Sequence, residues 1–119
     1  MRVFLVEDSP LLRGRVEAIV ASIPGAESVG HAAGADEAIA AIPSSRADVV
    51  VLDLQLEQGS GFDVMRALRK SAPQVRIYVL TNFAHEAYRR VAEKLGARGF
   101  FDKSREFDLL REALAAVSG

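Results

Sequence analysis

Three short runs of nearly uninterrupted apolar residues constrain most strongly how this chain can fold. They occupy residues 3–6, 49–52 and 77–80, and valine is the commonest residue in them. Strands that are covered on both faces have this composition, whereas half-exposed strands alternate apolar and polar residues. Between the runs lie longer stretches in which apolar residues recur at helical spacing. The pattern predicts a parallel sheet with helices on both of its faces.

The rest of the chain completes a series of strand and helix pairs. Weaker strands are predicted at residues 28–33 and 98–101. Helices are predicted at residues 10–23, 36–42, 61–71, 84–95 and 105–117. Ser9 followed by Pro10 marks the start of the first helix, and Gly96 marks the end of the fourth. We therefore expect an α/β protein with one domain over residues 1–119, which leaves nothing for an output domain.

The charge balance and the N-terminus argue against several classes of protein. The chain has 15 Lys and Arg residues against 16 Asp and Glu residues, a formal net charge of -1, so it lacks the positive field with which proteins bind nucleic acid. It has no cysteine, hence no disulfide and no thiolate metal site. The first residues contain too few apolar side chains for a signal peptide or a membrane span. We expect a cytoplasmic protein that binds neither nucleic acid nor membrane.

Polar side chains stand at the end of each strong strand and just beyond the last strand. Glu7 and Asp8 follow the first strand, and Asp53 follows the third. Thr81 follows the fourth strand, and Lys103 lies just beyond the fifth. In an open α/β sheet, ligands bind at the carboxyl edge of the strands. These residues, far apart in sequence, are therefore predicted to share one pocket.

The chemistry of this group points to phosphoryl transfer. Three carboxylates in one pocket repel one another unless a hard cation neutralises them, and Mg²⁺ binds few protein oxygens while leaving positions for phosphate oxygens. A lysine ammonium and a threonine hydroxyl suit the oxygens of a transferring phosphoryl group. An aspartate in such a site can act as the nucleophile and form an aspartyl phosphate.

Four segments carry these residues: VFLVEDSPLLR, VVVLDLQLEQGSGFDV, VLTNFA and LGARGFFDKS. Together and in this order they resemble the receiver domain of response regulators, the phosphoacceptor module of two-component signalling. The resemblance covers essentially the whole chain. It implies a doubly wound, five-stranded parallel sheet of flavodoxin-like order 2-1-3-4-5 with five flanking helices. It also implies that Asp53 is the phosphoacceptor.

The resemblance implies a set of metal ligands. Asp8 and Asp53 would supply side-chain oxygens to Mg²⁺, and Gln55 would supply its backbone carbonyl. Glu7 would orient a water molecule bound to the metal. The family pattern commonly has a proline four residues after the acceptor, whereas this sequence has Glu57, which predicts a less rigid loop.

The resemblance also implies a phosphoryl-binding pair and a switch. Thr81 and Lys103 would bind the phosphoryl oxygens, and Thr81 would act with Phe100, the aromatic residue three before Lys103. Asn82 and Phe83 would control access of the phosphodonor. Asn82 is bulkier than the small residue usual at that place, which narrows the path for small donors such as acetyl phosphate.

The resemblance implies two kinds of partner. A histidine kinase or a phosphotransfer protein would supply the phosphoryl group. A downstream protein, or a second copy of the chain in a homodimer, would bind the face formed by the fourth helix, the fifth strand and the fifth helix. The chain would catalyse only its own phosphorylation and dephosphorylation, so it would not be an enzyme in the ordinary sense.

Two alternatives belong to other functional classes. A Mg²⁺-dependent phosphohydrolase also uses an aspartyl phosphate on an α/β sheet, but such enzymes resemble a DxD pattern, and Gln55 stands where the second acid would be. A phosphate-independent interaction domain with a receiver-like fold would need none of the polar residues at the strand ends. The presence of the complete polar set argues against it.

Overall fold

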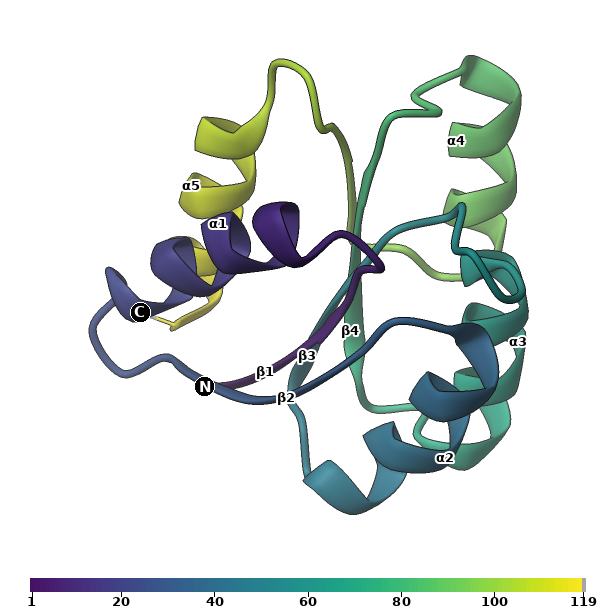
Figure 1. The fold of residues 1–119 in the computed structure, drawn as a ribbon, viewed down its shortest axis with the longest axis horizontal. Coiled ribbons are helices and arrows are strands. Elements are labelled where there is room, and N and C mark those ends of the chain that lie inside the picture. The colour runs from purple at the N-terminus through teal and green to yellow at the C-terminus, as the bar shows by residue number, and fades with distance from the viewer. Residues whose placement is uncertain (119) are drawn as a thin grey trace.

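The computed structural model describes residues 1–118, in which strands and helices alternate along the chain (Figure 1). The strands are β1 Arg2–Val6, β2 Glu27–Ala32, β3 Val49–Leu52, β4 Arg76–Thr81 and β5 Gly99–Asp102. The helices are α1 Pro10–Ala21, α2 Ala35–Ser45, α3 Gly61–Ser71, α4 Glu86–Lys94 and α5 Phe107–Ser118. Within the described residues the strands form one five-stranded parallel sheet in the order β2-β1-β3-β4-β5. The predicted fold class and strand order are confirmed.

The sheet separates two layers of helices. Figure 1 shows α1 and α5 on one face and α2, α3 and α4 on the other. Phe4 and Val50 are register partners and pack into the core beneath α2, α3 and α4. The next pair along, Leu5 and Val51, packs into the core beneath α1 and α5. Because successive strand residues point to opposite faces, a strand with a core on each side has to be apolar throughout.

The start of α1 and the end of α4 have the capping residues that the sequence predicts. The Leu12 N–H donates to Ser9 Oγ at 3.3 Å, and Pro10 occupies the first helical position, where its missing N–H costs nothing. Gly96 follows α4 with a φ of 96°, a left-handed conformation that glycine adopts without a steric penalty.

Helix α2 is longer than the prediction of residues 36–42. It runs to Ser45 with Pro43 inside its last turn. Proline there removes one backbone donor, and the turn nevertheless persists, with the Ser45 hydroxyl donating to the Ile42 carbonyl at 2.7 Å. Arg46 then ends the helix in the left-handed region, with φ 59°.

Helices α4 and α5 begin later than predicted, and helix α1 ends earlier than predicted. Helix α4 begins at Glu86 instead of residue 84, because His85 is still extended with ψ 148°. Helix α5 begins at Phe107 instead of residue 105. A turn precedes it, in which the Glu106 N–H donates to the Asp102 carbonyl and the Asp102 N–H donates to Glu106 Oε1, both at 2.8 Å. Helix α1 ends at residue 21, two residues before the predicted end.

The helices are short compared with a membrane span. The longest of those given above, α1 and α5, have 12 residues each. A span of the hydrocarbon core takes about 20 apolar residues. Within residues 1–118 no helix has the length and apolar character needed to cross a membrane.

Candidate functional site

The polar residues predicted to share a pocket lie together at the carboxyl edge of the sheet. Glu7 and Asp53 directly follow β1 and β3, which are neighbours in the sheet. Thr81 is the last residue of β4, and Lys103 directly follows β5. The side chains of Glu7, Asp53, Thr81 and Lys103 are the buried polar and charged groups of residues 1–118. Burying this many polar groups at one edge is costly unless they pair with one another or with a ligand.

Lys103 joins two of the acids. Its Nζ lies 2.7 Å from Asp53 Oδ2 and also contacts Glu7 Oε1. Burial lowers the pKa of Lys103, but the hydrogen bonds to Asp53 and Glu7 outweigh burial, so the pKa is raised and the side chain stays cationic. Burial raises the pKa of Glu7, although its hydrogen bonds with Lys103 and the Ser9 N–H act in the opposite direction.

The third acid completes a possible cation site. One carboxylate oxygen each from Glu7, Asp8 and Asp53 lies within 4.8 Å of the others. Three ionised carboxylates and one ammonium leave two negative charges, which a divalent cation would neutralise. An all-oxygen donor set of this size suits Mg²⁺, which keeps several of its water molecules. The residues therefore fit the metal that the sequence predicted.

Backbone hydrogen bonds fix the acids from the loop that follows β3. The Gln55 N–H donates to Asp53 Oδ1 at 3.3 Å. The Glu57 N–H donates to Asp8 Oδ2 at 2.9 Å. A proline at position 57 would have no N–H to donate, so the departure from the family pattern supplies a bond that holds Asp8. The sequence prediction of a less rigid loop overlooked this tie.

Gly61 holds the same loop close to the acceptor. It is the first residue of α3, and its N–H donates to the Leu54 carbonyl at 2.8 Å. A Cβ atom at this position would lie 2.3 Å from the Asp53 carbonyl oxygen and 2.8 Å from Leu54 Cα. Only glycine permits this approach. The role of Gly61 was not predicted from the sequence, and its only signal there is a glycine at a helical position where a residue of higher helix propensity is usual.

Thr81 is fully buried at the end of β4. Its Oγ1 accepts a hydrogen bond from the Phe83 N–H at 3.1 Å, so the threonine hydroxyl keeps its own proton for another acceptor. Asn82 is exposed, and Phe83 is partly buried. Phe83 also lines a hollow of about 280 Å³ with Gln55 and Tyr88, beside the acid cluster.

Phe100 is buried in β5, with 6% of its surface exposed. The guanidinium of Arg89 on α4 lies 4.7 Å from the centre of the Phe100 ring, and Arg89 Nη1 donates to the Phe100 carbonyl at 3.4 Å. Phe101, on the opposite face of the strand, is partly exposed. The aromatic residue predicted to switch is thus already turned inward and covered in this structure.

The fold and the acidic edge together define a receiver domain. A family model described as the response regulator receiver domain matches residues 3–115, and the chain belongs to that family. Receiver domains bind Mg²⁺ in an acidic pocket, and Glu7, Asp8 and Asp53 form such a pocket here. The family predicted from the sequence is confirmed, and with it the function of a two-component receiver.

Several of the curated relatives are named as transcriptional regulators. The chain is 33% identical to the DNA-binding transcriptional activator DevR/DosR of Mycobacterium tuberculosis, over 87% of this chain and 48% of the relative. It is 31% identical to the uncharacterized transcriptional regulatory protein YvfU of Bacillus subtilis, over 96% of this chain and 57% of the relative. The chain thus spans about half the length of these relatives.

Solved structures share the fold closely. A LuxR-family two-component response regulator from Aurantimonas is 31% identical, with a TM-score of 0.90 over 98% of this chain and 84% of that one. The response regulator domain of Thermotoga maritima CheB superposes with a TM-score of 0.87 over 99% of this chain and 92% of that one. Its identity is 24%, so this likeness speaks for the fold alone.

Proposed function

We propose that this domain accepts a phosphoryl group on Asp53 from a histidine kinase or a phosphotransfer protein and, in response, changes its binding to a downstream partner. The observation that carries the proposal is the buried Asp53 carboxylate, which lies 2.7 Å from Lys103 Nζ and beside the carboxylates of Glu7 and Asp8. A buried carboxylate within an acidic cluster is typical of a functional site, because the single ammonium of Lys103 does not balance the three acids.

Asp53 is the acid best placed to be the nucleophile. One of its oxygens accepts from the Gln55 N–H and the other from Lys103, so the carboxylate is held in one orientation. In the transfer, an oxygen of Asp53 attacks phosphorus, the bond to the donor nitrogen breaks, and the donor imidazole takes the electron pair. The products are an acyl phosphate on Asp53 and, once the donor ring has taken up one proton from solvent, a neutral histidine on the donor.

Asp8, Asp53 and the backbone carbonyl of Gln55 would hold Mg²⁺, and Glu7 would orient a water of its shell. When bound, the metal supplies positive charge that neutralises the acids and the phosphoryl oxygens. Lys103 would pair with one phosphoryl oxygen in place of its present bond to Asp53. The hydroxyl of Thr81, whose proton is free, would donate to another.

Mg²⁺ is expected to raise the melting temperature before any phosphoryl group arrives. A ligand that binds only the folded state adds about 1.4 kcal/mol at ten times its Kd, or about 5 °C for a domain of this size. Asp8→Ala should lose most of this Mg²⁺-dependent shift, whereas Asp36→Ala, an exposed acid on α2, should keep it. Differential scanning fluorimetry in EDTA and in millimolar MgCl₂ measures the shift. Equal melting temperatures for the unchanged protein in both buffers contradict the metal site.

The phosphoryl group is expected to act on the partner face through Thr81 and Phe100. As Thr81 moves toward the new dianion, the space behind it changes and Phe100 repacks beneath Arg89. Because Phe100 is already buried, we expect modest coupling, about 1 to 2 kcal/mol or five- to thirtyfold in partner affinity.

NMR with the phosphoryl mimic beryllofluoride tests this coupling. The ring signals of Phe100 and the amides of α4 should shift in the unchanged protein and in Thr81→Ser, which keeps the hydroxyl. In Thr81→Ala the mimic should still bind at Asp53 but leave the Phe100 ring unmoved. A partner face that responds while the Phe100 ring does not would exclude this route.

The partners and the setting of the domain follow from the same proposal. Phe83 and the exposed Asn82 would lie at the path of the phosphodonor. The face formed by α4, β5 and α5 would bind the downstream protein or a second copy of the chain. The domain would bind no nucleic acid itself, would work in the cytoplasm, and would catalyse only its own phosphorylation and dephosphorylation.

The alternative function is that of an enzyme, a Mg²⁺-dependent phosphohydrolase, and the residue at position 55 argues against it. In such an enzyme an acid two residues after the nucleophile works on the leaving group, whereas Gln55 is an exposed amide. Phosphate release from a generic monoester by the purified chain would support the enzyme reading over the receiver.

A further inference from the structure

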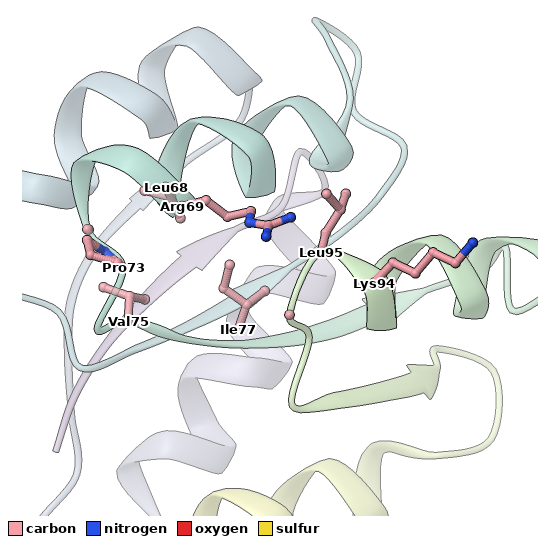
Figure 2. Close-up of a pocket in the computed structure, with 9 residues that line it drawn as sticks. Leu68, Arg69, Pro73, Val75, Ile77, Lys94 and Leu95 are labelled. Carbon is pink, nitrogen blue, oxygen red and sulfur yellow. The ribbon is translucent and has the colours of Figure 1, made fainter.

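A basic groove lies between α3 and α4, at the end of the sheet opposite the acids. One hollow of this groove, of about 220 Å³, is drawn in Figure 2. Leu68, Val75, Ile77 and Leu95 supply its apolar lining. Val75 directly precedes β4 and Ile77 is its second residue, whereas Thr81 of the acidic site ends that strand. A ligand in the groove would therefore leave the phosphoacceptor site free.

All ionisable residues that line the groove are cationic. Arg69 and Lys94 border this hollow, and a second, larger and more open hollow of about 730 Å³ along α3 adds Arg66 and Lys70 while sharing Arg69. Figure 2 shows Arg69 reaching from α3 toward Leu95, a residue that lines both hollows. The two hollows thus form one continuous surface, which we call the α3–α4 groove.

Most of these charges have no partner within the protein. Arg66 lies 3.4 Å from Asp63, but in residues 1–118 neither Arg69, Lys70 nor Lys94 forms an ion pair. Cations in the last turn of a helix interact favourably with the helix dipole, and this accounts for the sign of the charges on α3 and α4. It does not account for an apolar hollow between them. The combination of an apolar floor and a cationic rim needs a further explanation.

We propose that the α3–α4 groove binds an acidic segment of a partner protein, in which a short apolar stretch that supplies one anchoring side chain is flanked by Asp or Glu residues. The apolar side chain enters the hollow, and the flanking carboxylates pair with Arg69 and Lys94. The hollow of about 220 Å³ suits a single anchoring side chain, and the wider hollow of about 730 Å³ beside it leaves room for flanking residues. A nucleic-acid backbone would meet the rim but leave the apolar floor uncovered. The inference does not depend on phosphorylation of Asp53.

The probe is the blocked peptide acetyl-Glu-Glu-Leu-Phe-Glu-Glu-amide, titrated into the ¹⁵N-labelled chain. Amide shifts are expected for residues 66–77 and 94–96, and they should weaken as NaCl is raised, because rim charges are screened by salt. A peptide with Ser-Ser in place of Leu-Phe tests the apolar anchor and should produce little shift in these residues. A peptide with Lys in place of Glu tests the charge and should produce none.

Charge reversal locates the site on the protein. Arg69→Glu and Lys94→Glu should each weaken binding by about tenfold, since each replaces a charge-assisted contact by repulsion. Arg111→Glu makes the same change of net charge on α5, on the other face of the sheet, and should change binding less than about twofold. All three side chains are exposed, so the variants are expected to fold.

Three results would overturn the proposal. The first is a titration in which the amide signals of the groove residues do not shift, or in which the shifted amides lie outside the groove. The second is equal binding of the Leu-Phe and Ser-Ser peptides, which would mean that only the surface charges of the groove, and not its apolar lining, contribute to binding. The third is tighter binding of a single-stranded oligonucleotide than of the acidic peptide. Asp53→Asn should bind the peptide as the unchanged protein does, so failure of the phosphoacceptor proposal would leave this test intact.

Discussion

Replacing Asp53 with asparagine is expected to abolish phosphorylation and to leave the fold intact. Asparagine has nearly the volume of aspartate, but its neutral amide is no nucleophile toward phosphorus. Lys103 keeps Glu7 as a partner in the variant, so no unpaired cation is left buried. A phosphorylated histidine kinase or phosphotransfer protein, in the presence of MgCl₂, should add one phosphoryl group to the unchanged protein and none to Asp53→Asn. Intact-protein mass spectrometry counts the added groups.

A second acid serves as the control for this experiment. Asp63→Asn changes an exposed aspartate on α3 and should leave the extent of phosphorylation unchanged. Circular dichroism establishes that both variants are folded. If Asp53→Asn still gained a hydroxylamine-sensitive phosphoryl group, the acceptor would be another carboxylate of the cluster, and Asp8 and Glu7 would be next to test.

Gly61→Ala is expected to be among the most destabilising single-methyl additions in the chain. The new Cβ would lie 2.3 Å from the Asp53 carbonyl oxygen, and this atom belongs to backbone that cannot turn aside. Relief requires the loop after β3 to move away from α3, at a cost of about 2–3 kcal/mol in the free energy of unfolding. Urea unfolding followed by circular dichroism measures this loss.

Gly14→Ala is the matched control, because it adds the same methyl group where there is room. Gly14 is exposed in the middle of α1, and a Cβ atom there would meet nothing within 4 Å. Alanine should raise the free energy of unfolding by about 0.5–1 kcal/mol through its better helix propensity. If both substitutions changed stability in the same direction, the contact of Gly61 with the acceptor loop would not be what requires glycine.

The order and type of the elements were predictable because burial leaves a direct mark on the sequence. A strand such as β3 is covered on both faces, so none of its side chains is exposed to solvent and all of them are apolar. The ends of helices depend on particular hydrogen bonds instead. The Ser45 hydroxyl that supports the last turn of α2 and the Glu106 carboxylate that caps the Asp102 N–H act through geometry that only the folded chain provides.

The candidate site was predictable in its side chains but not in its backbone. Glu7, Asp53 and Lys103 can be recognised in the sequence because each is a charged residue at or just beyond the end of an apolar run. Burying a charge there is costly unless it is paired or binds a ligand. The tie between the Glu57 N–H and Asp8 has no such signal, because every residue except proline has an N–H. The close packing of Gly61 was equally hidden, since the atoms that it approaches are those of another segment.

Helix α4 is held more loosely than its neighbour α3. Of its residues only Ala92 is buried, and Tyr88 and Val91 leave 39% and 37% of their surface exposed. Because opening α4 would uncover little apolar surface, the free energy of this local opening lies far below that of global unfolding. We therefore expect α4 to open locally more often than α3, also before any signal arrives. If Asp53 is phosphorylated as proposed, the phosphoryl group would not have to build a new conformation, because it would only have to shift this local equilibrium.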